Sequence, residues 1–218
     1  MSPLRLLLFA AAAGFLITFV QLGLLRLAFD KLGLSPDSAV LLLAVTLLGS
    51  LLNLPLFALK VDAQAQREAL KRIPRMFLPR LKIVPGKTII AVNVGGCVVP
   101  VAFSLYLFTH TDVDLLRVLL TVAIVSVVAY RGSVLVPGLG VALPAFIAPL
   151  VAALIGVALD PEHGPVLAYI GGTLGVLIGA DVLRLKDIKK SGEPIASIGG
   201  AGTFDGIFVT GILAALIA

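Results

Sequence analysis

The stretch PVLAYIGGTLGVLIGADVLR, residues 165–184, decides the fold class of this chain. It has about the 20 residues that a helix needs to cross the hydrocarbon core of a bilayer, and its charged residues, Asp181 and Arg184, stand near its end. The whole chain of 218 residues has the same character: 59% of its residues are hydrophobic, 13% are charged, and the mean hydropathy is +1.12. A soluble domain of this length has too little interior to bury so much apolar surface. We therefore expect a membrane protein.

The apolar segments predict an all-α, polytopic transmembrane helix bundle of about seven helices, which forms a single domain over residues 1–218. Helices are expected because a backbone that faces lipid must satisfy its own hydrogen bonds, and the Leu, Ile and Val runs lack the alternation of a membrane β-barrel. Residues 60–87 form a polar insert, which we expect to be a basic amphipathic linker on the cytoplasmic surface of the membrane. The predicted helices cover approximately residues 5–28, 38–59, 88–109, 114–131, 140–159, 165–184 and 200–218.

The distribution of basic residues predicts the orientation of this bundle. Of the 17 Lys and Arg residues, all except Arg26, Lys31 and Arg117 fall on one face. By the positive-inside rule that face is cytoplasmic, so we expect the N-terminus inside and a multi-pass protein of the cell (plasma) membrane. The net charge of +5 follows from this bias and indicates contact with anionic membrane lipid. It does not indicate nucleic acid, because the basic residues flank membrane spans and form no recognition motif.

One cysteine and two histidines limit the chemistry that the chain can perform. A single Cys97 excludes a disulfide within the chain, and one Cys with His110 and His163 cannot build a metal cluster. Both histidines fall in predicted outer turns, where a solvated loop residue is the simplest interpretation. We expect no metal site and no cofactor.

Two aspartates inside apolar helices are the candidate site. A carboxylate in hydrocarbon is costly, so Asp181 and Asp205 each suggest a function. Asp181 lies within about one turn of the cytoplasmic boundary, and Asp205 lies about five residues, or roughly 7.5 Å, into the last helix. Because the two helices are antiparallel neighbours, we expect the carboxyl groups at similar depth. Asn53 and Asn93 are predicted in the same leaflet, as a supporting polar layer.

The chemistry of these acids has two readings. In one, both acids are structural. The negative charge of Asp205 is stabilised by the positive end of its helix dipole, and Asp181 pairs with Arg184 or Lys186 near the interface. In the other, the two acids form a dyad. Two carboxyl groups close together in a low dielectric share a single proton near neutral pH. The ionised partner then accepts a proton from an attacking water, and the protonated partner supports the oxyanion and the leaving amine of a peptide.

The sequence GAGTFD, residues 200–205, resembles a stretched form of the Gly-x-Gly-Asp motif of presenilins and signal peptide peptidases. The resemblance implies an intramembrane aspartyl protease in which Asp181 and Asp205 are catalytic. It also implies that Gly200 and Gly202 give backbone room for substrate. The segment ALPAF, residues 142–146, resembles the Pro-Ala-Leu element that lines the cleft in that family. By that resemblance, Leu143, Pro144, Ala145 and Phe146 would help to hold an unwound substrate strand.

The chain as a whole resembles a family of prokaryotic multi-span membrane proteins of unknown function. The segments that carry this resemblance are LGLSP (residues 32–36), LGSLLN (48–53) and GAGTFDGIF (200–208). This second resemblance extends over nearly the full length of the chain but implies no activity.

Our first functional hypothesis is therefore a compact intramembrane aspartyl protease that hydrolyses membrane-embedded peptides at a dyad near the cytoplasmic face. The alternative is a cation- or proton-coupled transporter or channel that uses the same buried aspartates. In that case the glycine- and proline-rich stretches 132–144 and 191–202 would be interrupted helices. A non-catalytic scaffold is the third hypothesis, and it predicts that Asp→Asn changes are tolerated. The oligomeric state stays open.

Overall fold

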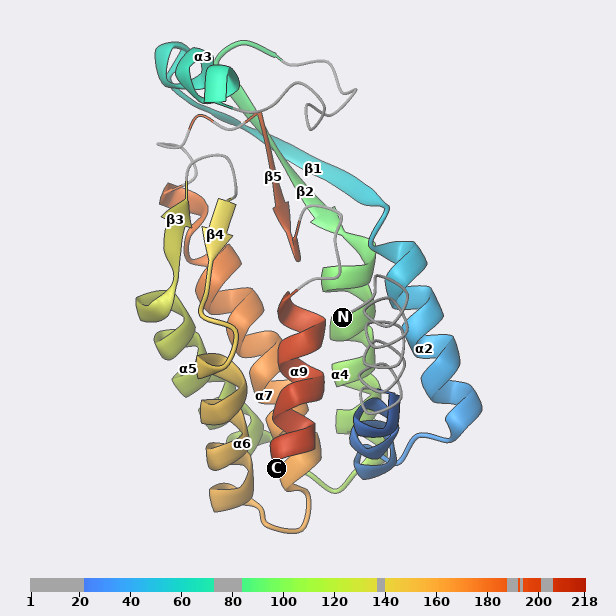
Figure 1. Cartoon of the computed structure of the whole chain (residues 1–218). Coiled ribbons are helices and arrows are strands. Elements are labelled where there is room, and N and C mark those ends of the chain that lie inside the picture. The colour runs from blue at the N-terminus through green and yellow to red at the C-terminus, as the bar shows by residue number, and fades with distance from the viewer. Residues whose placement is uncertain (1–21, 73–83, 137–139, 188–191, 193, 201–205) are drawn as a thin grey trace, which may run out of the picture.

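The computed structural model describes residues 22–72, 84–136, 140–187, 192, 194–200 and 206–218 (Figure 1). Two predicted site residues, Gly202 and Asp205, lie outside the described residues. Within the described ranges the chain is mostly helical, with a small sheet at one end of the helices and the C-terminus at the opposite end. The description all-α is therefore wrong in its strict sense, although the prediction of a helical bundle is confirmed.

The helices form the body of the molecule. A helix through Leu22–Lys31 meets α2 at a bend of 110°. The π-helical segment η2 leads directly into α4, and α7 leads directly into a second π-helical segment, η3. The bounds are α2 Pro36–Gly49, η2 Val94–Val98, α4 Val99–His110, α5 Leu115–Gly132, α6 Ile147–Leu159, α7 Gly164–Val176, η3 Leu177–Val182 and α9 Gly206–Ile217.

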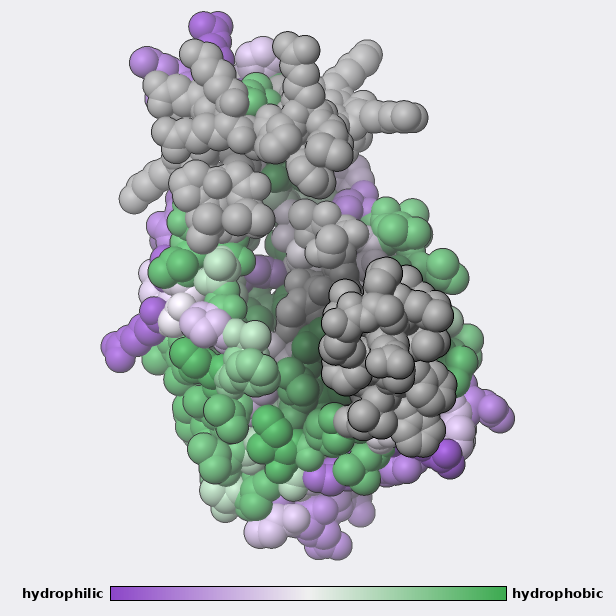
Figure 2. All heavy atoms as spheres, viewed as in Figure 1, coloured by the Kyte–Doolittle hydropathy of each residue, from purple (hydrophilic) through white to green (hydrophobic). Residues whose placement is uncertain are grey.

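Two of these helical stretches, Leu115–Gly132 and Gly164–Asp187, are long and apolar enough to cross a membrane. The bent pair formed by Leu22–Lys31 and α2 would make a third span. Figure 2 shows hydrophobic residues over the sides of the helices and hydrophilic residues gathered toward the two ends of the molecule. Among the described residues the structure thus has two or three candidate spans, together with shorter apolar helices.

In three of the predicted helices, one end is a β-strand in the structure. The segment predicted as helix 38–59 ends at Gly49 and continues as strand β1 (Asn53–Lys60). The segment predicted as helix 88–109 begins with strand β2 (Lys87–Asn93). The segment 140–159 begins with strand β4 (Gly140–Ala142), which pairs with β3 (Val134–Val136) in an antiparallel hairpin. In the described parts of the Gly- and Pro-rich stretch 132–144, residues 134–136 and 140–142 are thus paired strands, where an interrupted helix is the alternative expectation.

The main sheet has the order β1-β2-β5, where β5 is Ile195–Ile198. β1 and β2 are antiparallel, from the pair Asn53 and Asn93 to the pair Lys60 and Lys87, whereas β2 and β5 are parallel. Local sequence explains these strands. Pro55 removes a backbone donor and disfavours a continuing helix, while β2 is rich in β-branched residues that favour extended backbone.

The polar insert is the far end of this β-ribbon. Its helix α3 (Ala63–Arg72) connects the two long strands and projects away from the helical body (Figure 1). Gln66, only 2% exposed, holds α3 on the ribbon. Its amide nitrogen donates to the carbonyl oxygen of Lys87 at 2.8 Å, and its amide oxygen accepts from the N–H of Gly86 at 2.6 Å. Within the insert predicted as a basic linker, the structure thus has a short helix that a buried glutamine docks on the ribbon.

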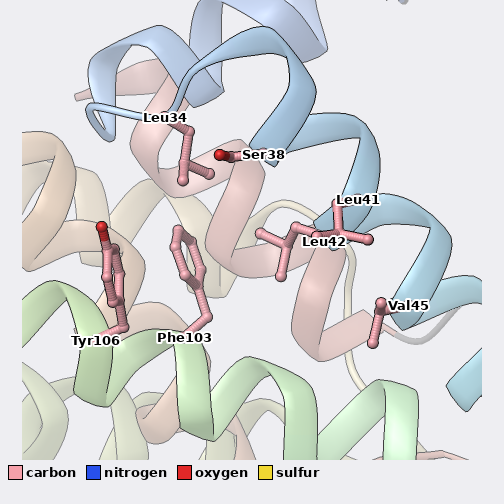
Figure 3. Close-up of a pocket in the computed structure, with 7 residues that line it drawn as sticks. All are labelled: Leu34, Ser38, Leu41, Leu42, Val45, Phe103 and Tyr106. Carbon is pink, nitrogen blue, oxygen red and sulfur yellow. The ribbon is translucent and has the colours of Figure 1, made fainter.

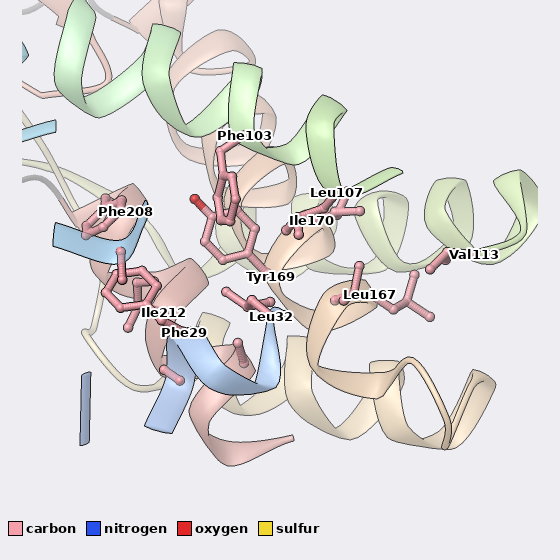
Figure 4. Packing of buried hydrophobic residues seen from close by; sticks show 14 of the residues in the cluster. Phe29, Leu32, Phe103, Leu107, Val113, Leu167, Tyr169, Ile170, Phe208 and Ile212 are labelled. Atoms are coloured by element: carbon pink, nitrogen blue, oxygen red, sulfur yellow. The ribbon is translucent and has the colours of Figure 1, made fainter. Parts of the chain in front are cut away.

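The core is centred on α7, which packs against α4, α5, α6 and α9. The glycine stripe Gly171, Gly175 and Gly179 faces α5, where a Cβ on each glycine would collide with Thr121, Val125 or Ser126. This is the close helix contact that a small-xxx-small pattern predicts. On another face of α7, Tyr169 meets Phe103 edge to face, with ring centroids 5.1 Å apart (Figure 4). Packing against neighbouring helices thus holds α7 in place on several sides, and Asp181 follows α7 directly in η3.

Candidate functional site

Asp181 lies in η3, where the long helix of α7 changes to a π-helical turn. Its side chain is half-buried, and its Oδ2 accepts a hydrogen bond of 2.7 Å from the backbone N–H of Gly199. Short π-helical segments are frequent at functional sites because they re-aim side chains within a helix. Asp181 therefore combines an unusual local backbone with a donor from a distant part of the chain.

That donor comes from a glycine turn that directly follows β5. Gly199 and Gly200 both have a φ of 84°, in the left-handed region that favours glycine. Space is also limiting, because a Cβ on Gly199 would lie 2.6 Å from the Cβ of Cys97. The turn is therefore held between η2, which carries Cys97, and η3, which carries Asp181.

A buried asparagine fixes the other side of this junction. Asn93, only 1% exposed, donates from Nδ2 to the carbonyl oxygen of Ser50 at 2.7 Å and to Oδ1 of Asn53 at 3.2 Å. Its Oδ1 accepts from the N–H of Gly96 at 2.7 Å, which caps η2. Ser197 in β5 donates to the same Oδ1 of Asn53 at 2.6 Å. Asn53 and Asn93 are thus brought together, as strand residues rather than helix residues.

The hydrophobic surroundings of Asp181 link it to the start of α9. Ala180, which precedes Asp181, and Ile207, two residues after Asp205, belong to one buried cluster. Cys97, Leu143 and Ile198 pack against the same cluster. The described neighbours of the two aspartates therefore share one environment.

The predicted substrate-binding segment contributes in part. Leu143 packs on the cluster around Ala180, and its Cδ1 lies 3.4 Å from a Cβ placed on Gly132. Pro144, Ala145 and Phe146 are exposed, with Phe146 66% exposed. This segment forms the turn between β4 and α6, so the helix predicted to begin at residue 140 begins only at Ile147.

Arg184, one turn after Asp181, has other partners. Its Nη2 donates to the carbonyl oxygens of Tyr130 and Ser133, both at 2.6 Å, and its Nη1 pairs with Asp187 at 3.0 Å. The guanidinium also lies 4.5 Å from the centre of the Tyr130 ring. These contacts connect the C-terminal end of α5 to the residues that follow η3, so Arg184 stabilises the packing of the two helices.

At the opposite end of the helices Asp160 joins α5, α6 and α7. Its Oδ2 pairs with Arg117 at 2.7 Å, and its Oδ1 accepts from the N–H of His163 at 3.1 Å. Burial raises the pKa of Asp160, but the His163 N–H and the Arg117 guanidinium outweigh it, so the pKa is lowered. This cluster is a structural tie. No group of His, Cys, Asp or Glu able to hold a metal ion occurs in the part of the chain that the structure describes.

Sequence reasoning missed Ser197 and Gly199. β5 has only four residues, too few for a periodicity signal, and Cys97 lies far from Gly199 in the chain. One local pattern could have predicted this element. The run Ile-Ala-Ser-Ile followed by Gly199-Gly200 is typical of a strand that ends in a left-handed turn.

Comparison with known proteins adds a family. Neither the curated proteins nor the solved structures gave a match. The resemblance to presenilins and signal peptide peptidases therefore rests on the short motifs alone. A family model described as "Protein of unknown function (DUF1614)" matches residues 47–217, which include both aspartates and every strand of the sheet. The chain belongs to this DUF1614 family of proteins of unknown function.

Proposed function

We propose that this protein is an intramembrane aspartyl peptidase in which Asp181 and Asp205 act as a dyad on membrane-embedded peptides. The observation that carries the proposal is the 2.7 Å hydrogen bond from Gly199 to Asp181. It ties Asp181 to the beginning of the glycine-rich segment that leads, six residues later, to Asp205.

The packing of the neighbouring residues supports a meeting of the two acids. Ala180 and Ile207 share a buried cluster, and α7 and α9 are in direct contact over their length. A side chain just after Ala180 and one just before Gly206 are therefore expected near the same end of the bundle.

The sheet supports a peptide substrate. Among the described strands β5 pairs on one side only, with β2, and its chain continues into the glycine turn beside Asp181. An open strand edge can pair with an extended peptide through backbone hydrogen bonds. A substrate segment along β5 would present its backbone near Asp181, as peptide hydrolysis requires.

In the proposed reaction the two acids have different roles. A backbone N–H favours the ionised form of the carboxylate that accepts from it, so we assign Asp181 as the general base. Asp181 removes a proton from water as the oxygen attacks the peptide carbonyl, and Asp205 protonates the carbonyl oxygen. As the tetrahedral intermediate collapses and the C–N bond breaks, Asp181 gives its proton to the leaving amine. Asp205 recovers a proton from a hydroxyl of the intermediate, which restores both acids to their starting states.

The test is cleavage of a single-span reporter peptide by the full-length chain in liposomes. Asp181→Asn and Asp205→Asn are each expected to reduce the cleavage rate about 100-fold or more. Asp187→Asn is the matched control, because it removes a nearby carboxylate that pairs with Arg184 and has no part in the chemistry. Cleavage that survives the double change Asp181→Asn with Asp205→Asn would overturn the proposal.

A second candidate function is cation- or proton-coupled transport, and one observation favours it. Within the described part of the chain, the side-chain hydroxyls of Thr46, Ser104 and Ser126 are buried and have no hydrogen-bond partner. Polar groups inside a membrane bundle also mark pathways for ions or water. Ion flux into liposomes that is lost in Asp181→Asn, with no cleavage of any reporter, would favour this function over the peptidase.

A further inference from the structure

Ser197 joins two strands that are not neighbours in the sheet. It lies in β5, whereas Asn53 begins β1, and β2 runs between these strands. The register of β1 pairs Asn53 with Asn93. The register of β5 pairs Ser197 with Ala91, which lies on the same face of β2 as Asn93. The hydrogen bond of 2.6 Å between the Ser197 hydroxyl and Oδ1 of Asn53 therefore crosses β2 and connects β1 directly to β5.

The direction of each hydrogen bond in this network follows from one backbone donor. The N–H of Gly96 can only donate, so the side-chain atom of Asn93 that it meets at 2.7 Å is the oxygen. The Nδ2 of Asn93 therefore faces Asn53, which must present its own oxygen. Ser197 meets that same oxygen of Asn53 and must donate to it. An apolar residue at position 197 would leave this oxygen with one donor fewer.

β5 has few other features that fix its register on β2. It has four residues and, among the described strands, pairs on one side only. Ser197 is its one residue with a side-chain donor, since the strand reads Ile-Ala-Ser-Ile. A slip of one residue would turn Ser197 to the opposite face and move Gly199 by about 3.3 Å along the strand. The Ile and Ala side chains resist such a slip less, because hydrophobic contact is not directional.

We infer that Ser197 is a positioning residue, which fixes the register of β5 and so holds the N–H of Gly199 on the carboxylate of Asp181. Gly199 follows Ser197 by two residues, and its N–H donates to Asp181 at 2.7 Å. In Figure 1, β5 points from the ribbon toward the part of the molecule where α9 begins. A displacement of about 3.3 Å would break the bond to Asp181, because such bonds have donor–acceptor distances of about 2.7–3.2 Å. The catalytic role of Asp181 rests on the proposed function, whereas the positioning of its donor does not.

Two substitutions that differ only in a hydroxyl group test this inference. Ser197→Thr keeps the donor, whereas Ser197→Val has the same shape without it, and both residues suit a strand. Hydrogen exchange of the full-length chain in detergent, resolved at the Gly199 amide, should be about tenfold faster in Ser197→Val than in Ser197→Thr, the factor that one hydrogen bond supplies. Amides of α5 and α7 should exchange at the same rate in both variants. Ser38→Val is the control and should leave Gly199 unchanged, since Figure 3 shows Ser38 beside Leu34, at the end of α2 away from Ser50.

Cleavage of the reporter peptide in liposomes gives the second measurement. We expect kcat to be about tenfold lower in Ser197→Val than in Ser197→Thr, with KM unchanged, because a peptide can pair with the edge of β5 in either register. Equal kcat values in the two variants would overturn a role of Ser197 in catalysis. Equal exchange at Gly199 would overturn the inference whether or not the reporter is cleaved, and so would faster exchange throughout α5 and α7 in Ser197→Val. A difference confined to Gly199 in a chain that cleaves no reporter would uphold the positioning role and overturn the proposed peptidase.

Discussion

Gly199 lies against Cys97 so closely that a Cβ atom on the glycine would come within 2.7 Å of the Cys97 backbone nitrogen. The same glycine gives its N–H to Asp181. The donor on Asp181 is therefore positioned by η2, a segment that belongs to a different part of the chain.

Gly199→Ala is expected to destabilise the protein and to displace the donor from Asp181. The added Cβ has no space, which costs about 1–3 kcal/mol of the free energy of unfolding, and the left-handed backbone disfavours alanine as well. Thermal unfolding in detergent measures the first effect and reporter cleavage measures the second. Gly23→Ala is the control, because a Cβ there has nothing within 4 Å. Equal melting temperatures for the two variants would contradict this account.

Asn93→Leu is expected to lower stability more than Asn53→Ala. The leucine keeps the size of the side chain but leaves the Ser50 carbonyl and the Gly96 N–H without their buried partner. Unsatisfied buried groups cost about 1–3 kcal/mol each, whereas Asn53 is exposed and its partners can reach water. Chemical unfolding of both variants measures the difference, and a larger loss for Asn53→Ala would refute it.

Gln66→Leu is expected to release α3 from the β-ribbon without affecting the helical body. The change removes the hydrogen bonds from this buried side chain to Lys87, Gly86 and Val84. Hydrogen exchange of the α3 amides should accelerate, while that of α5 and α7 should not change. Gln64→Leu serves as the control because Gln64 is exposed. Unchanged protection of α3 in Gln66→Leu would show that other contacts hold it.

Asp160 is expected to make the stability of the folded protein depend on pH in the acidic range. Because its pKa is lowered in the folded protein, the stabilisation is fully present above the unfolded pKa and is lost as the pH falls through the folded one. The melting temperature of Asp160→Asn should lie below that of the wild type at neutral pH, and the difference should begin to shrink below about pH 4 and disappear only below the lowered pKa of the folded protein. Asp112→Asn, at an exposed turn, is the control. A difference that persists unchanged in acid would rule out this origin.

The helices that the sequence predicts best are those whose apolar runs are about as long as the hydrocarbon core is wide. Residues 114–131 and 165–184 correspond closely to α5 and to α7 with η3, because length and hydropathy alone determine them. The spacing of Gly171, Gly175 and Gly179 also predicts a close helix contact, and the structure shows that contact with α5.

The strands could not be predicted from the length and hydropathy of local segments. Short apolar runs such as Lys87–Asn93 look like the end of an adjoining helix, and only their pairing with distant strands distinguishes them. The sequence predicts Asn53 and Asn93 as related polar residues, and the structure relates them as directly paired strand residues, which the sequence pattern does not reveal. The role of Gly199 depends on Cys97 and Asp181 at once, and no local pattern contains that information.

The parallel pairing of β2 with β5 has a consequence for biosynthesis. β5 is translated long after β2, with α4, α5, α6 and α7 between them, so the Ile89–Ile195 pairing closes a very long loop. That edge of β2 therefore stays without β5 while α4, α5, α6 and α7 are synthesised. The junction that carries Asp181 is among the last parts of the molecule to assemble, which keeps the proposed site incomplete in a nascent chain.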